Sequence, residues 1–238
     1  MAEIKEKPKA SLDVAGQFDR LEFLFHTYKK QLGIVGAVVI AVVGIAAAFK
    51  WWYVPTQDAE ARSEMFYAEN YFAIDSFKIA AAGGVAVKLP NGTEKIIKGF
   101  EQISEDYNLT PSGNLANYYL GICYLRTGRY EEAIQKLEDF STSDVLLSAV
   151  ALGAMGDAQI ELNKPDEAIR YYLKAADQYA NTFNSPIYLK KAAFAYELQS
   201  NYPEAIKLYE RIQREYAKST EARDIEKYLT RAKMMGNL

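Results

Sequence analysis

The chain has 238 residues, of which half are hydrophobic and a quarter are charged, and its formal net charge is −3. This length suffices for one substantial helical domain plus a separate apolar segment, and the small numbers of glycines (14) and prolines (7) favour helices. Nucleic-acid binding needs a basic face for the phosphates, and the sequence has no run of Lys and Arg, so we expect no nucleic-acid partner.

Residues 1–30 form a polar tail that ends in an aromatic segment. The residues from Phe18 to Tyr28 place apolar side chains at helical spacing. This pattern predicts a short amphipathic helix lying on the cytoplasmic face of a membrane.

Residues 31–54 are predicted to form a transmembrane signal anchor. Every residue from Leu32 to Phe49 is apolar or glycine, and a helix of this length rises about 27 Å, close to the thickness of the hydrocarbon layer. Lysines flank the segment, and aromatic residues follow it, as expected at the level of lipid headgroups. We therefore expect a membrane interface formed by Lys29, Lys30, Trp51, Trp52 and Tyr53.

Two other interpretations of this segment are less favoured. A buried core helix would not be apolar on all sides between lysines and an aromatic cluster. A cleaved signal peptide, with Ala46–Ala48 at the cleavage site, would have a much shorter polar region before its apolar core.

The flanking charges predict the orientation of the anchor. Positive residues precede it closely, whereas acidic residues predominate after it, so we expect the N-terminus in the cytoplasm. Residues 55–238 then lie outside the cytoplasm. In a Gram-negative bacterium the anchor is in the inner membrane and this domain is periplasmic.

The region near 58–111 predicts an irregular first helical unit. An aromatic-rich helix is expected over residues 58–81, and Gly99, Ile103 and Pro111 match the second helix of a repeat. Between them lies an insertion at residues 83–93, in which alternating apolar residues and Asn91-Gly92 indicate a loop or small hairpin.

Three repeats follow, near residues 114–147, 149–182 and 186–218. Each contains a Glu-Ala-Ile element, and its alanines, Ala133, Ala168 and Ala205, recur 35 and 37 residues apart. Leu120, Gly121 and Tyr124, with Gly128 and Leu137, make the chain resemble the tetratricopeptide repeat family, whose period is 34 residues. The resemblance implies an all-α fold in which a transmembrane helix precedes a tetratricopeptide-repeat α-solenoid, closed by a capping helix at residues 219–235.

In this family the first helices of successive repeats line a concave groove. The resemblance therefore implies that a partner protein binds along this face, and it places eight residues there: Tyr118, Ile122, Arg126, Asp157, Glu161, Lys190, Phe194 and Glu197. The alternative is that these residues form a solvated or self-packed face.

The sequence does not favour an enzyme. Cys123 is the only cysteine and His26 the only histidine, so nucleophilic catalysis and zinc binding are poorly supplied. The acidic pairs Glu131-Glu132 and Asp166-Glu167 fit helix starts, where negative charge is favourable. No phosphate-binding glycine motif occurs, so we expect no catalytic, cofactor-binding or metal-binding residues.

The complete arrangement resembles the YfgM family of bacterial inner-membrane proteins. The resemblance rests on RLEFLFHTYKK before the anchor, on the Gly- and Val-rich span, on Trp51-Trp52-Tyr53 and on QDAEARSEM after it. It implies an accessory of the Sec translocon that contacts the channel subunits, a periplasmic peptidyl-prolyl isomerase-like chaperone and membrane lipid. The alternative is a scaffold for cell-envelope assembly that works with the peptidoglycan or outer-membrane machinery.

Overall fold

The computed structural model describes residues 14–237, and their side chains from Tyr28 onward with the exception of Leu32. The chain divides into two units, Met1–Val54 and Pro55–Leu238. In the first unit, helix α1 (Val14–Ala48) continues into a π-helical turn, η1 (Phe49–Tyr53). The predicted helix at residues 18–28 lies within α1, but its side chains before Tyr28 and the tail before residue 14 lie outside the described part.

The helical stretch from Tyr28 to Ala73 is long and apolar enough to cross a membrane. Its most apolar 18-residue window has a mean hydropathy of 2.7, and none of that window is buried in the structure. Length and composition alone support this property.

The second unit starts with two helices where the sequence predicts one. Helix α2 (Val54–Ala73) ends before Asp75, and α3 (Phe77–Ala82) follows. Asp75 has a φ of 59°, and the next amide, that of Ser76, donates to the carbonyl of Tyr71 at 2.9 Å. Aspartate tolerates this left-handed conformation better than most residues, so the chain turns here instead of extending the helix.

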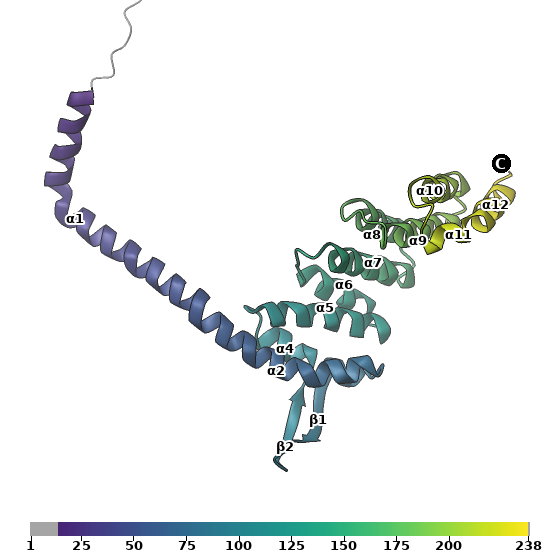
Figure 1. The fold of residues 1–238 in the computed structure, drawn as a ribbon, viewed down its shortest axis with the longest axis horizontal. Helices are drawn as coiled ribbons and strands as arrows, with labels where there is room; N and C mark the ends of the chain where they lie inside the picture. Colours follow the sequence, from purple (N-terminus) through teal and green to yellow (C-terminus); the bar gives the residue numbers. More distant parts are fainter. Residues whose placement is uncertain (1–13, 238) are drawn as a thin grey trace, which may run out of the picture. The chain divides into compact units, whose positions relative to one another are not determined.

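A two-stranded antiparallel hairpin follows α3. Strand β1 (Gly83–Lys88) pairs with β2 (Glu94–Lys98), with Ala86 opposite Ile96 and an irregularity between Gly83 and Ala86. The second strand thus extends the insertion beyond the predicted residues 83–93. Figure 1 shows the hairpin projecting from the neighbouring helices.

The remaining helices form stacked antiparallel pairs (Figure 1). We call the first helix of each pair the A helix and the second the B helix. The three pairs are α5 (Pro111–Arg126) with α6 (Tyr130–Asp139), α7 (Val145–Glu161) with α8 (Pro165–Asp177), and α9 (Ser185–Leu198) with α10 (Tyr202–Glu215). Helix α4 (Phe100–Asp106) precedes the pairs, and the short helices α11 (Thr220–Arg223) and α12 (Ile225–Met235) follow them.

Small residues allow the paired helices to approach closely. A Cβ atom added at Gly121 on α5 would lie 2.6 Å from the Cγ atom of Leu137 on α6. Leu137 is itself 1% exposed, so the glycine provides the space that the leucine fills. This contact joins the A and B helices of the first regular repeat.

The turn between the A and B helices has the same backbone form in all three pairs. Gly128, Asn163 and Ser200 have φ values of 82°, 57° and 58°. In each case the following amide donates to a carbonyl five residues earlier, for example from Lys164 to Gln159 at 2.9 Å. A left-handed residue of this kind commonly ends a helix.

Helix α2 is held to the array by a buried polar contact. Asp58 is 5% exposed, and its Oδ1 atom accepts a hydrogen bond from the backbone N–H of Ser112 at 2.8 Å. Ser112 is in the first turn of α5, where amides have no partner within the helix. The carboxylate therefore caps α5 from another helix, and Arg62 pairs with its second oxygen.

Candidate functional site

Five of the eight residues predicted for the concave face line one groove. Tyr118, Ile122 and Arg126 lie along α5, and Asp157 and Glu161 lie on α7. The groove has a volume of about 580 Å³. The other residues of its walls are Leu125, Tyr130, Val150, Gly153, Ala154, Ile160, Tyr172, Tyr188 and Lys191.

The centre of this A-helix groove is a compact polar network. The carboxylate of Asp157 accepts a hydrogen bond from the hydroxyl of Tyr172 at 2.7 Å. The Nζ atom of Lys191 donates to both carboxylate oxygens, also at 2.7 Å. Both ion-pair side chains are 37% exposed, so water and a ligand can reach them. Burial, followed by the negative charge of Asp157, raises the pKa of Tyr172 above its usual value, which keeps the phenol neutral.

The rim of the A-helix groove has two charges that the protein leaves available. Arg126 is exposed and forms no ion pair with any residue that the structure describes. Glu161 is also exposed, and it accepts one long hydrogen bond, 3.3 Å, from the hydroxyl of Tyr130. A polar ligand could therefore pair with either side chain without breaking an existing ion pair.

Two glycines of α7 make room for the tyrosines of the groove. A Cβ atom at Gly153 would lie 2.0 Å from Cε1 of Tyr188, and one at Gly156 would lie 2.5 Å from Cε1 of Tyr172. Burial also raises the pKa of Tyr188. The tyrosine rings occupy the space that side chains at these glycines would fill, and so the groove wall is aromatic.

The other three predicted residues lie beneath the C-terminal helix. The ring of Phe194 is 5.2 Å from that of Tyr228 on α12, and the Nζ atom of Lys190 lies 4.2 Å from the centre of the Tyr228 ring. Glu197 accepts hydrogen bonds from the hydroxyl of Tyr209 at 2.7 Å and from Arg231 at 2.6 Å. These residues contact the protein's own capping helix.

Sequence reasoning missed the residues that complete the groove wall. Lys191, Tyr172 and Tyr188 were not predicted, although Lys191 is the neighbour of the predicted Lys190. The available signal was Gly153 and Gly156 on an A helix, since two such glycines require large partners on the next helices.

A second groove lies on the opposite side of α7. It has a volume of about 610 Å³ and is formed mainly by α6, α7, α8 and the loop between α6 and α7. Its lining residues are Leu137, Glu138, Phe140, Ser141, Thr142, Ser148, Leu152, Met155, Arg170, Tyr171, Lys174 and Tyr179. Lys174 is exposed and, within residues 28–237, has no ion-pair partner, which makes it a match for Arg126 on the other face.

Metal ligands and the single thiol can be assessed among the described residues. No group of three His, Cys, Asp or Glu side chains among them could hold a metal ion. Cys123 is fully buried, and this burial raises the pKa of its thiol to about 12. The thiol is therefore protonated at neutral pH and is a poor nucleophile.

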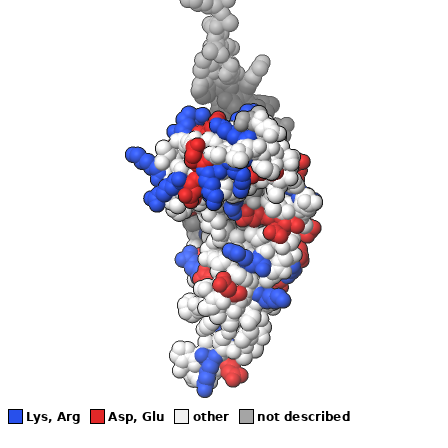
Figure 2. Space-filling view, turned by 90° about the vertical axis from the view of Figure 1, so that its right-hand side faces the viewer, with Lys and Arg blue, Asp and Glu red and all other residues white. Residues whose placement is uncertain are grey.

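Charges of both signs are mixed on one face of the molecule. Figure 2 shows Lys and Arg side chains interspersed with Asp and Glu on the face that it views.

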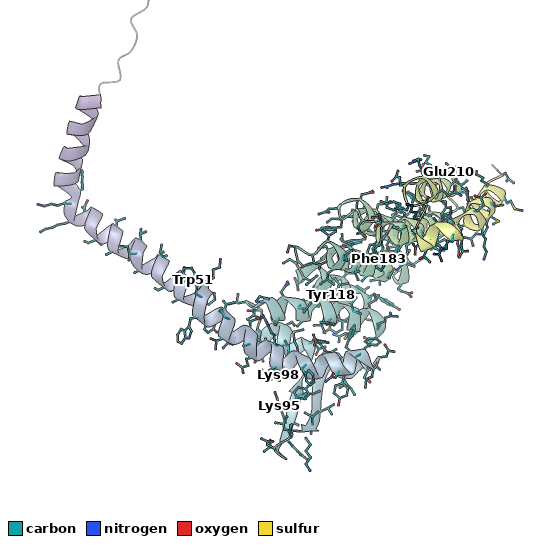
Figure 3. The ribbon with its side chains drawn as sticks, viewed as in Figure 1. Trp51, Lys95, Lys98, Tyr118, Phe183 and Glu210 are labelled. Carbon is teal, nitrogen blue, oxygen red and sulfur yellow. The ribbon has the colours of Figure 1, made fainter. Side chains whose placement is uncertain are left out.

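The predicted interface residues of the first unit are exposed. Lys29 and Lys30 are exposed, and Trp51 and Trp52 are 78% and 77% exposed. Tyr53 stacks on Phe49 with ring centroids 5.2 Å apart. Figure 3 shows the Trp51 side chain extending from its helix.

Comparison with known proteins finds tetratricopeptide repeats in two segments of the array. The tetratricopeptide repeat family matches residues 99–140 and 154–220. No curated protein sequence matches the chain. Among solved structures, the MamA protein is similar with a TM-score of 0.51 and 16% identity, over 74% of this chain and 84% of MamA. A crystal structure titled as the nearly identical TPR-like repeats of a Podosopora anserina putative kinesin light chain has a TM-score of 0.49 and 16% identity to this chain. The alignment covers 78% of this chain and 87% of that chain.

The family match and the similarity to MamA agree with the stacked helix pairs, their small-residue contacts and their uniform turns. The fold is therefore all-α, with tetratricopeptide repeats, and an apolar N-terminal helix precedes the α-solenoid.

Proposed function

We propose that the array is an adaptor that holds an extended segment of a partner protein in the A-helix groove. Tetratricopeptide repeats are protein-interaction modules, and the observation that supports this groove is its composition. Ile122 and Val150 offer apolar contacts, whereas Arg126 and Glu161 offer unpaired charges at the rim. An extended polypeptide presents both kinds of group on alternating sides.

We further propose that the first unit anchors this adaptor in the inner membrane of a bacterium. The N-terminus would lie in the cytoplasm and the array in the periplasm. The apolar helix and the exposed Trp51 and Trp52 support this arrangement, together with the flanking positive charges. An alkaline phosphatase reporter fused after Leu238 is expected to be active, and activity of a cytoplasmic reporter there would overturn the orientation.

The partner that we propose is the Sec translocon, with its channel subunits and a peptidyl-prolyl isomerase-like periplasmic chaperone. The support for this choice is the resemblance to the YfgM family described above. An anchored array at the channel exit would meet emerging chains while they are still extended. The array has a scaffold fold, and we propose no catalytic role for it.

The first test is a pull-down of the tagged full-length protein from native membranes in mild detergent. Recovery of channel subunits and the chaperone, lost when the span is replaced by an unrelated one, would support a translocon accessory. Recovery of peptidoglycan or outer-membrane assembly proteins instead would replace the translocon with an envelope scaffold.

A matched pair of charge reversals tests the groove itself. Arg126→Glu and Lys174→Glu each change an exposed basic residue that lacks an ion-pair partner in the described chain. Arg126 lines the A-helix groove, whereas Lys174 lines the second groove, on the opposite side of α7. We expect Arg126→Glu to reduce partner recovery severalfold and Lys174→Glu to leave it unchanged. Equal recovery with both variants would exclude the A-helix groove as the binding surface.

A further inference from the structure

The hairpin is a two-stranded sheet with an open edge. A sheet of two strands is marginally stable by itself, and an unpaired edge readily accepts another strand. This hairpin is fixed to the array by its side chains. Ile97 is 1% exposed, Lys95 pairs with Glu64 on α2 at 2.9 Å, and Lys98 pairs with Asp106 on α4 at 2.6 Å. Figure 3 shows the two lysines on the hairpin.

The backbone pattern identifies which groups of β2 face outward. The amide of Leu89 donates to the carbonyl of Thr93 at 2.8 Å, so residues 89 and 93 form a hydrogen-bonded pair. Hydrogen-bonded and non-hydrogen-bonded pairs alternate along an antiparallel ladder. The pairs of Glu94 with Lys88 and of Ile96 with Ala86 are therefore non-hydrogen-bonded, and the N–H and C=O groups of Glu94 and Ile96 point away from β1.

The two edges of the hairpin differ in their ability to pair. Strand β1 is irregular between Gly83 and Ala86, and a bulge of this kind disfavours edge pairing. Its only charged residue is Lys88, so two copies of β1 would gain no attraction between opposite charges. Strand β2 is regular and carries both signs of charge.

The sequence of β2 is complementary to itself when two copies run antiparallel. With Ile96 opposite Ile96 of a second copy, Glu94 lies opposite Lys98, and Lys98 lies opposite Glu94. All three side chains share one face of the strand, because strand residues two apart point the same way. Ile96 is 63% exposed, so its apolar surface is available to a second copy.

We propose that two copies of this chain pair through β2 in the antiparallel register centred on Ile96, joining their hairpins into one four-stranded sheet. Two opposite-charge pairs and one apolar pair then fix the register, and each Lys98 is shared between Asp106 of its own chain and Glu94 of the other copy. Other registers that pair only the outward-facing residues of this edge do not place both glutamates opposite lysines. A five-residue edge buries a small area, so the dimer is expected to be weak and reversible.

Charge exchange between copies provides the principal test. Full-length chains carrying either of two affinity tags are mixed in detergent micelles, and co-purification of one tag with the other is measured. In Glu94→Lys, like charges face each other in both outer pairs, as they also do in Lys98→Glu, which in addition loses the ion pair with Asp106. Each variant alone is therefore expected to co-purify about tenfold less than the original chain.

Mixing the two variants restores opposite charges in both outer pairs, because the lysine at position 94 then faces the glutamate at position 98. We expect co-purification of the mixture to recover to near the original level. Recovery would also show that both variants are folded. Equal co-purification by the original chain and by each single variant would overturn the proposal.

Disulfide trapping tests the register independently, since Cys123 is buried and is the only native cysteine. Directly opposite residues in an antiparallel pair have Cα atoms within reach of a disulfide. Ile96→Cys is expected to form covalent dimers under mild oxidation. Ala86→Cys is the matched control, because it lies on the same face but one strand further from the proposed axis. Dimers from Ala86→Cys but not from Ile96→Cys would show that the copies pair through a different edge. Adducts of Ile96→Cys only with another protein would show that a different partner occupies this edge.

Discussion

The contact between Gly153 and Tyr188 predicts a substitution whose effect on stability changes sign with its background. Alanine at position 153 would place its Cβ atom 2.0 Å from Cε1 and 2.4 Å from Cζ of Tyr188. A normal contact requires the ring to move by about 1.5 Å, and overpacking of this kind costs about 1–3 kcal/mol. Alanine also favours the helix by about 1 kcal/mol over glycine. We therefore expect Gly153→Ala to destabilise the original chain by roughly 0–2 kcal/mol.

Removing the ring should leave only the favourable part. In a Tyr188→Leu background, Gly153→Ala is expected to stabilise the array by about 1 kcal/mol, which corresponds to a rise of roughly 2–4 °C in Tm for a domain of this size. Tyr188→Phe is the matched control, because it keeps the ring and should preserve the penalty. Thermal unfolding of all six chains by circular dichroism gives the comparison. The same change in Tm in all three backgrounds would refute the steric explanation.

Three further predictions concern other parts of the chain. Asp58→Ala should lower the free energy of unfolding by about 2 kcal/mol, because the buried amide of Ser112 loses its acceptor. Burial raises the pKa of Asp58, but hydrogen bonds from Ser112 and Arg62 outweigh it and lower the pKa below 3.8. The stability that the carboxylate contributes is thus present above pH 3.8 and lost as the pH falls below it, so urea unfolding of the two chains should converge in acid. Cys123 should react with iodoacetamide at pH 8 only after unfolding, and rapid labelling of the folded chain, detected by mass spectrometry, would contradict its burial. Trp51 and Trp52 are the only tryptophans, so brominated lipids should quench nearly all tryptophan fluorescence if the anchor is inserted, and unchanged emission would argue against it.

The regular repeats could be predicted because their pattern is local. The Glu-Ala-Ile elements mark each B helix, and Gly121 and Leu137 lie in contact as their family positions imply. Residue spacing within each repeat is enough to predict its helices and their pairing. The family match and the similarity to MamA agree with the stacked architecture.

Features that depend on distant parts of the chain were harder to predict. Helix α2 ends near Asp75 without a neighbouring glycine or proline, and the sequence does not predict that an aspartate adopts the left-handed conformation there. The sequence predicts a capping helix, but not that Tyr228 and Arg231 would cover Phe194 and Glu197. The half-burial of Phe194 and Glu197 depends on the angle at which α12 packs on α9, and hydrophobic periodicity does not specify that angle.

The groove shows the same limit at finer scale. Family geometry placed Tyr118, Ile122 and Arg126 together along α5, since they are four residues apart on one helix. It did not identify the network of Asp157 with Lys191 and Tyr172, which joins three helices. Such a network depends on which rotamers the neighbouring helices allow, and only the folded structure fixes them.

The shared turn between the A and B helices implies that the three repeats are not equally strained. Glycine adopts the left-handed conformation freely at position 128, asparagine adopts it at a modest cost at 163, and serine at 200 lacks either advantage. In an array whose units contact only their neighbours, local cost remains local. The turn of the last pair, α9 and α10, therefore costs most of the three, and the contacts of α12 with that pair offset this cost.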